Sequence, residues 1–142
     1  MTEEAPAVVR KKFPRTWYYP QWHLVQWYPQ GVFNEAFADQ IVQFIEMEER
    51  IQDAPFDRFT DFSGLSDVRL SMAHVFQAAR RRRTVKQPAK SAFFADKAIS
   101  FSIAQMYERL MSTAIIEVRA FDDRAAASKW LEVPLQILSP PE

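Results

Sequence analysis

Short apolar runs alternate with helical patterns along most of this chain, and this alternation constrains the fold more than any other feature. The run at 89–96 is short and apolar, as expected for an interior parallel strand, and the run at 113–121 is the most strand-like segment of the chain, with Ile115, Ile116 and Val118. Between such runs, apolar residues recur three and four positions apart, as on one face of an amphipathic helix. The order predicts an α/β protein with a mostly parallel sheet and right-handed crossovers.

The first two strand-like runs lie next to each other and predict a β-hairpin before the parallel sheet. Residues 17–19 and 23–28 are aromatic and β-branched, and Pro20-Gln21 separates them. Residues 1–14 are polar and interrupted by proline, which predicts a flexible N-terminal arm and leaves 15–142 as one domain. An exposed edge of the hairpin would offer a surface for a homodimer.

Start signals and apolar spacing predict four helices. Asn34 is a suitable N-cap, and apolar residues at 37, 41, 44, 45 and 51 follow it at helical spacing. We expect Ser66 or Asp67 to cap the second helix, Asp96 the third and Asp122 the fourth. The segment 133–138 is expected to pack on the domain as a tail.

The composition argues against several classes of function. The chain has 142 residues, of which 48% are hydrophobic and 25% charged, and these values suit a globular domain. The formal net charge is zero, so the molecule has no strong field to attract nucleic acid or a membrane. No apolar run approaches the length of a spanning helix, and the first residues lack the apolar segment of a signal peptide. We therefore expect a cytoplasmic protein.

The stretch Asp61-Phe62-Ser63-Gly64-Leu65 marks a sharp turn in the middle of the chain. Gly64 is one of two glycines, and a strand that enters a helix through a tight turn needs a residue that tolerates unusual backbone angles. A helix beginning here would place Ser63 beside free backbone N–H groups, which would stabilise a phosphate. Alternatively, Ser63 only satisfies the turn through an ordinary hydrogen bond.

With the hairpin before it, this turn resembles the STAS fold of the bacterial anti-sigma-factor antagonists, the SpoIIAA-like proteins. In those proteins a strand ends in an Asp-Ser-Ser-Gly-Leu-like turn, and a partner kinase phosphorylates the serine before the glycine. The chain matches at four of these positions and departs at Phe62. The resemblance implies a non-catalytic protein-interaction module that is phosphorylated at Ser63. The implied interaction face comprises Asp61, Gly64, Leu65 and Asp67.

A closer resemblance extends from Trp17 to Leu138. It is to uncharacterised bacterial SpoIIAA-like proteins that are grouped with the CRAL-TRIO lipid-transfer fold. The segments that carry it are "FDRFTDFSGL", "VKQPAKSAFFAD" and "EVRAFDDRAAASKWLEV". It implies an alternative function, the binding of a small apolar ligand or lipid in an apolar cleft. The candidate lining residues of that cleft are Trp22, Trp27, Phe93, Phe101 and Tyr107.

The densest positive patch is the arginine run at the end of the second expected helix. Four successive arginines could bind phosphate, lipid head groups or RNA. The alternative is a solvated helix end whose cations complement the helix dipole. The candidate anion-binding residues are Arg80, Arg81, Arg82 and Arg83.

Catalytic and metal chemistry have little support in the sequence. A hydrolase would have to bring Ser63, His74 and Asp61 together, and no Gly-x-Ser-x-Gly elbow supports that arrangement. The chain lacks cysteine, a glycine-rich phosphate loop and a metal-ligand spacing. We therefore expect no enzymatic activity, no cofactor and no metal.

Overall fold

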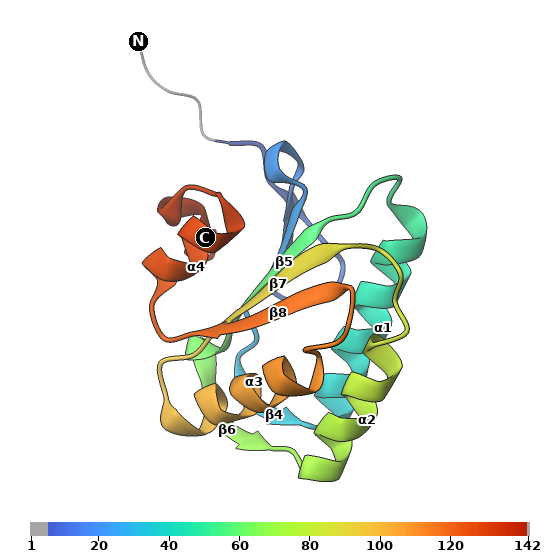
Figure 1. The fold of residues 1–142 in the computed structure, drawn as a ribbon. Helices are drawn as coiled ribbons and strands as arrows, with labels where there is room; N and C mark the ends of the chain where they lie inside the picture. The colour runs from blue at the N-terminus through green and yellow to red at the C-terminus, as the bar shows by residue number, and fades with distance from the viewer. Residues whose placement is uncertain (1–5, 142) are drawn as a thin grey trace.

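A six-stranded sheet with the strand order β1-β2-β3-β5-β7-β8 forms the centre of the molecule (Figure 1). The computed structural model describes residues 6–141. The strands β3, β5, β7 and β8 run parallel, whereas β1 and β2 are antiparallel to their neighbours. The α/β class, the hairpin and the mostly parallel sheet are thus confirmed. The six strands are β1 (Val9–Arg10), β2 (Thr16–Tyr19), β3 (Leu24–Trp27), β5 (Asp57–Asp61), β7 (Ala89–Phe94) and β8 (Ile116–Phe121).

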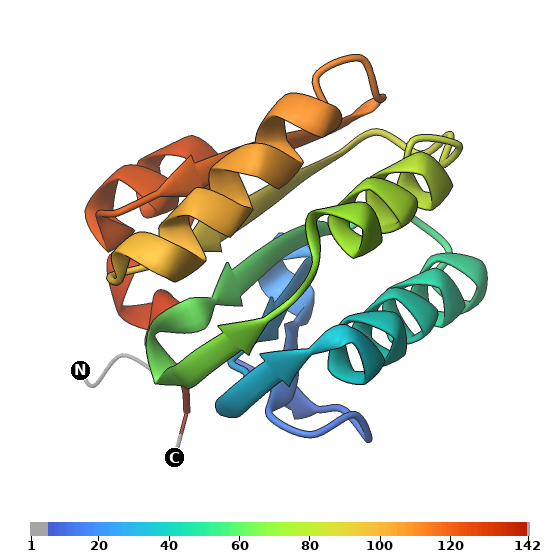
Figure 2. The same ribbon diagram turned by 90° about the horizontal axis from the view of Figure 1, so that it is seen from below.

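Helices cover both faces of this sheet. Helices α1 (Glu35–Ile51), α2 (Met72–Arg82) and α3 (Ala98–Leu110) lie on one face, and α4 (Arg124–Leu131) lies on the other (Figures 1 and 2). Three 3₁₀ turns complete the described chain: η1 (Pro20–Trp22), η2 (Phe62–Gly64) and η3 (Leu135–Leu138). The tail at η3 packs against α4, since Ile137, Leu138 and Leu131 share one buried cluster.

A second, two-stranded parallel sheet joins β4 (Gly31–Asn34) to β6 (Leu65–Arg69), and the sequence pattern predicted neither strand. The expectation that Ser66 or Asp67 caps the second helix is therefore wrong, because both residues lie in β6. Helix α2 begins seven residues after Leu65, at Met72, and its N-cap is Ser71, whose Oγ accepts from the His74 N–H at 3.1 Å. Ser63 consequently does not lie at a helix N-terminus.

The other expected helix starts are correct to within one residue. Asn34 caps α1 as predicted, and its Oδ1 accepts from the Phe37 N–H at 2.9 Å. The N-cap of α3 is Lys97 rather than Asp96, and it makes no side-chain capping bond. The N-cap of α4 is Asp123 rather than Asp122, since the Asp123 carboxylate accepts from the Ala125 N–H at 2.9 Å.

Two glycines are required for different reasons. Gly31 has a φ of 82°, in the left-handed region that favours glycine. Gly64 has no such φ, so the expected reason for it is wrong. A Cβ at Gly64 would lie 2.9 Å from the Pro29 carbonyl oxygen, and the turn is therefore packed against the β3–β4 connection too closely for a side chain.

The described part of the predicted arm, from residue 6, is attached to the domain over several residues. Strand β1 pairs with β2, so it covers the hairpin edge that was expected to be exposed. The ring of Phe13 stacks on Phe44 with centroids 5.2 Å apart, and the Lys11 ammonium lies 3.3 Å from Glu48. The first five residues of the arm lie outside the described residues.

Candidate functional site

The turn that carries Ser63 begins directly after β5, and the last residue of that strand has a fully buried carboxylate. Asp61 has no exposed surface, and its Oδ1 accepts from the Ser63 N–H at 2.9 Å. This bond fixes the first turn of η2, because an aspartate side chain at such a position replaces a backbone acceptor. Ser63 itself is half-buried.

Arg124, the first residue of α4, joins the strand to the turn. Its Nη2 donates to Asp61 Oδ2 at 2.9 Å and to Ser63 Oγ at 3.0 Å, and its Nε donates to Asp61 Oδ2 at 3.2 Å. The guanidinium carbon lies 4.2 Å from the centroid of the Phe94 ring, within the range of a cation–π contact. Charge-assisted bonds of this kind are stronger than neutral ones, so the geometry of the turn is well determined.

A second cation lies on the other side of the turn. Lys97 Nζ donates to the carbonyl oxygens of Ser63 at 3.2 Å and of Leu65 at 2.9 Å. The hydroxyls of Tyr28 and Ser63 lie 3.3 Å apart and share a hydrogen bond. Ser63 is therefore contacted by an arginine, a lysine and a buried carboxylate.

The other residues of the expected interaction face differ in exposure. Asp67 is exposed on β6, where a hydrogen bond from Arg69 and one from the Val68 N–H lower its pKa. Gly64 is half-buried, and Leu65 is 2% exposed and belongs to the core. The accessible part of this face is therefore β6 rather than the turn itself.

The residues of the hydrolase alternative are not assembled. The His74 ring bonds to Asp39 at 2.8 Å and approaches Glu35 at 3.7 Å, whereas the Ser63 hydroxyl bonds to Arg124 and Tyr28. Among residues 6–141, no group of three or more His, Cys, Asp or Glu side chains could hold a metal ion.

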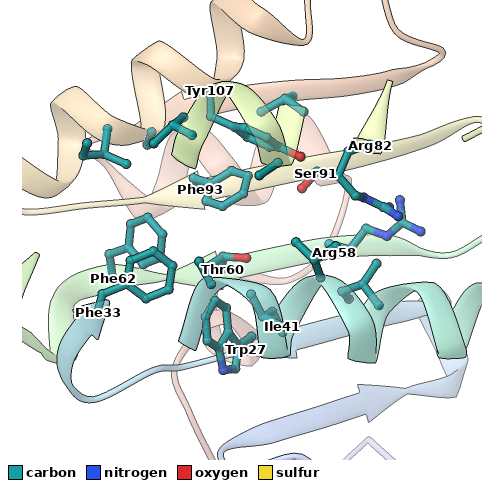
Figure 3. A pocket seen from close by; sticks show the side chains of 18 of the residues that line it. Trp27, Phe33, Ile41, Arg58, Thr60, Phe62, Arg82, Ser91, Phe93 and Tyr107 are labelled. Atoms are coloured by element: carbon teal, nitrogen blue, oxygen red, sulfur yellow. The ribbon is translucent and has the colours of Figure 1, made fainter. Parts of the chain in front are cut away.

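A cavity of about 130 Å³ lies between the sheet and helices α1, α2 and α3 (Figure 3). Of the five residues expected to line an apolar cleft, Trp27, Phe93 and Tyr107 line this one. The other two do not: Trp22 packs near Tyr19 on the α4 side of the sheet, and Phe101, on α3, is partly buried against the cluster that includes Phe33 and Phe62. The volume is below the 300 Å³ or more that is usual for drug-sized ligands.

The cavity also has polar walls that sequence reasoning did not identify. Arg58, Thr60 and Ser91 are three polar residues within the interior strands β5 and β7, and they line the cavity together with Arg82. Side chains alternate along a strand, so Arg58 and Thr60 face the three helices while Phe59 faces α4. The available signal was the pair of polar residues at alternate positions of β5, on either side of Phe59, together with Ser91 in β7.

Arg58, Arg82 and Glu49 form a buried ion cluster at one end of the cavity. Glu49 Oε2 accepts from Arg58 Nη2 and from Arg82 Nη2, each at 2.6 Å, and Glu49 Oε1 accepts from Arg82 Nη1 at 2.9 Å. Burial alone would raise the pKa of Glu49, but the hydrogen bonds and charges of the two arginines outweigh it and lower that pKa. Burial lowers the pKa of Arg58, which still remains charged because guanidinium groups lose their proton only at very high pH.

The arginine run does not act as one open patch. Arg82 is buried in the ion cluster, and Arg81 forms an ion pair with Glu46. Arg80 and Arg83 are exposed, at positions that complement the dipole of α2. Anion binding by the whole run stays a prediction.

A search of solved structures found one of similar fold. No protein-family model and no curated protein match the sequence. An uncharacterised protein of the DUF3478 family from Shewanella loihica PV-4, described as having a SpoIIAA-like fold, aligns with a TM-score of 0.50 and 14% identity. The alignment covers 92% of this chain and 98% of that one. The fold of this chain is therefore SpoIIAA-like, as the sequence resemblance predicted. None of the described helices is long and apolar enough to cross a bilayer.

Proposed function

We propose that this protein is a binding module of the anti-sigma-factor-antagonist type, and that phosphorylation of Ser63 switches its docking surface. The observation that carries the proposal is the position of the Ser63 hydroxyl, 3.0 Å from Arg124 Nη2 and beside the fully buried Asp61. The SpoIIAA-like fold supports the same class of function by analogy.

The proposed switch depends on competition between the Asp61 carboxylate and a phosphate on Ser63 for the Arg124 guanidinium. A phosphate on Ser63 carries about −1.5 to −2 charges and three strong acceptor oxygens. It would draw the Arg124 guanidinium and the Lys97 ammonium toward itself, since both already contact Ser63. Asp61 would then lose the one ion-pair partner that it has among the described residues, and an unpaired buried carboxylate is costly. The turn would have to rearrange to relieve that cost.

The proposed docking surface is β6, because it moves with the turn. Leu65 follows η2 directly, and Lys97 holds its carbonyl oxygen together with that of Ser63. Ser66, Asp67 and Arg69 are exposed on this strand. β6 pairs only with β4 among the described strands, so its other edge has backbone groups that a partner can use.

Phosphosite mapping by mass spectrometry, on protein purified from its native cells in several growth phases, tests this function. We expect phosphate on Ser63 in at least one growth phase. Ser66 serves as the internal control, because it is three residues away and exposed but has no contact with Arg124. Phosphate on Ser66 without phosphate on Ser63, or no phosphate on either serine in any sample, would contradict the proposal.

A further inference from the structure

The buried guanidinium of Arg58 has donors that the described protein does not satisfy. The Arg58 side chain is 6% exposed, and its Nη2 donates to Glu49. Its Nε and Nη1 are buried and find no acceptor among the described residues. Unpaired donors on a buried cation are costly and rare, so a donor of this kind points to an acceptor beyond the described residues, either an ordered water or a bound ligand.

These donors belong to a residue that lines the cavity. Figure 3 shows Arg58 and Arg82 at one end of the cavity, next to Ser91, and the rings of Phe33 and Phe62 at the other end. Most of the remaining lining is apolar and comes from α1, α2, α3 and β8. The cavity therefore has one cationic end and one apolar end.

Among the described residues, the ion cluster at the cationic end carries one positive charge in excess. Arg58 and Arg82 carry two positive charges, and Glu49, with which both pair, carries one negative charge. The neighbouring Arg81 and Glu46 pair with each other and add no net charge. A ligand with a single negative charge would neutralise this cluster, whereas a phosphate monoester would bring about −1.5 to −2 charges.

The volume of the cavity limits the rest of the ligand. An internal cavity of about 150 Å³ in another protein holds benzene, so a cavity of about 130 Å³ suits an apolar body of about six non-hydrogen atoms at most. A two-chain lipid is too large for this space. Guanidinium groups bind carboxylates through parallel N–H···O bonds, and a carboxylate is the smallest organic anion that accepts two of them.

We propose that the cavity between the sheet and helices α1–α3 binds a small monocarboxylic acid, with its carboxylate on Arg58 and its apolar body against Phe33, Phe62 and Phe93. Short-chain fatty acids and aromatic acids both combine one carboxylate with a small apolar body. Hexanoate represents the first class of acid and benzoate the second. The ligand site goes beyond the proposed Ser63 switch and does not depend on it, because Ser63 does not line the cavity.

Methyl NMR spectra of the full chain, titrated separately with hexanoate and benzoate to millimolar concentrations, test the proposal. The reporters are the methyl groups of Ile103, Ile116 and Val118, which line the cavity. Ile99, which is 63% exposed, serves as the internal control. We expect saturable shifts of the three reporters with at least one acid and no shift of Ile99. Hexan-1-ol, which has the same chain without the charge, should bind at least about tenfold more weakly than hexanoate.

Three variants assign the binding to its residues. Arg58→Met should weaken acid binding by about tenfold or more and leave the weak binding of hexan-1-ol unchanged. Arg80→Met makes the same change at an exposed arginine and should have no effect. Ala78→Leu adds three carbon atoms to the cavity lining and changes no charge, and it should abolish binding, so it tests the site even if Arg58→Met fails to fold.

Several results would overturn this inference. They are equal binding of hexanoate and hexan-1-ol, acid binding that persists in folded Arg58→Met or Ala78→Leu, and the absence of reporter shifts with both acids. None of these results bears on phosphorylation of Ser63, so the two proposals fail independently.

Discussion

Arg124 and Asp61 are 63 residues apart in the sequence, yet Arg124 Nη2 lies 2.9 Å from the carboxylate of the fully buried Asp61. The contact connects the first residue of α4 to the last residue of β5. The same Nη2 lies 3.0 Å from Ser63 Oγ. One guanidinium thus contacts both the end of a strand and the following turn from the first residue of a helix.

Removing this guanidinium should destabilise the protein. Arg124→Met leaves the Asp61 carboxylate buried without an ion-pair partner, which costs about 1–3 kcal/mol in the free energy of unfolding. This loss of stability is smaller than the loss that is usual for a fully buried ion pair, because the Arg124 side chain is 35% exposed. Urea denaturation measures the difference. Arg109→Met, at an exposed position of α3, is the control and should change stability by less than about 0.5 kcal/mol. Equal effects of the two substitutions would show that the contact is unimportant.

The two glycines should respond differently to substitution. Asparagine tolerates the left-handed region, so Gly31→Asn should cost less than about 1 kcal/mol in unfolding free energy. Gly64→Asn should cost more, about 1–3 kcal/mol, because its Cβ meets the Pro29 carbonyl at 2.9 Å. Thermal or urea denaturation compares the pair. A smaller loss at Gly64 than at Gly31 would contradict the close packing of the turn.

The overall fold could be predicted from the sequence because most of its elements are local patterns. The interior strand β7 is a short, mostly apolar run, the edge strand β8 alternates apolar and charged residues, and α1 has both a capping Asn34 and apolar residues at helical spacing. The small β4–β6 sheet could not be predicted in the same way. Its strands are stabilised by pairing between positions such as Phe33 and Val68, and that pairing exists only in the folded chain.

The candidate sites were less predictable, because they depend on contacts between distant residues. The motif around Ser63 identified the turn, but the contact with Arg124 spans 61 positions and has no local signal. The arginine run suggested an open cationic patch, whereas the fold directs Arg82 inward to Glu49 and Arg58. Only the three-dimensional arrangement shows that a single interior arginine on β5 faces a cavity.

Acid should weaken the fold through Glu49. Its pKa is lowered in the folded protein from the ordinary value of 4.5, since the hydrogen bonds and charges of Arg82 and Arg58 outweigh the effect of burial. A lowered folded-state pKa contributes stability above pH 4.5, and this contribution is lost as pH falls from 4.5 through the folded-state pKa. The stability difference between wild type and Glu49→Gln, measured by urea denaturation, should therefore shrink as pH falls below 4.5. A difference that stays constant with pH would contradict this role.

Alkali should weaken the fold through Tyr107, which lines the cavity. Burial raises its pKa above the ordinary value of 10.0 against the opposing charges of Arg82 and Arg58. A raised folded-state pKa contributes stability that is complete below pH 10.0 and is lost as pH rises through the folded-state pKa. Tyr107→Phe should therefore lose less stability than wild type when denaturation is repeated at increasing pH. An identical alkaline decline in the two proteins would contradict this assignment.

The most direct test of the central claim, that the Ser63 turn switches a docking surface on β6, is the crosslinking yield in native cells from a photoreactive residue at position 67. Glu117, exposed on β8, is the matched control position for the crosslinker. We predict a defined crosslinked partner from position 67 but not from position 117. The crosslinking yield from position 67 should be retained in Ser63→Ala. It should fall by about tenfold or more in Ser63→Glu, because the new carboxylate competes with Asp61 for Arg124. Equal yields from Ser63→Ala and Ser63→Glu, with both proteins folded, would contradict the account.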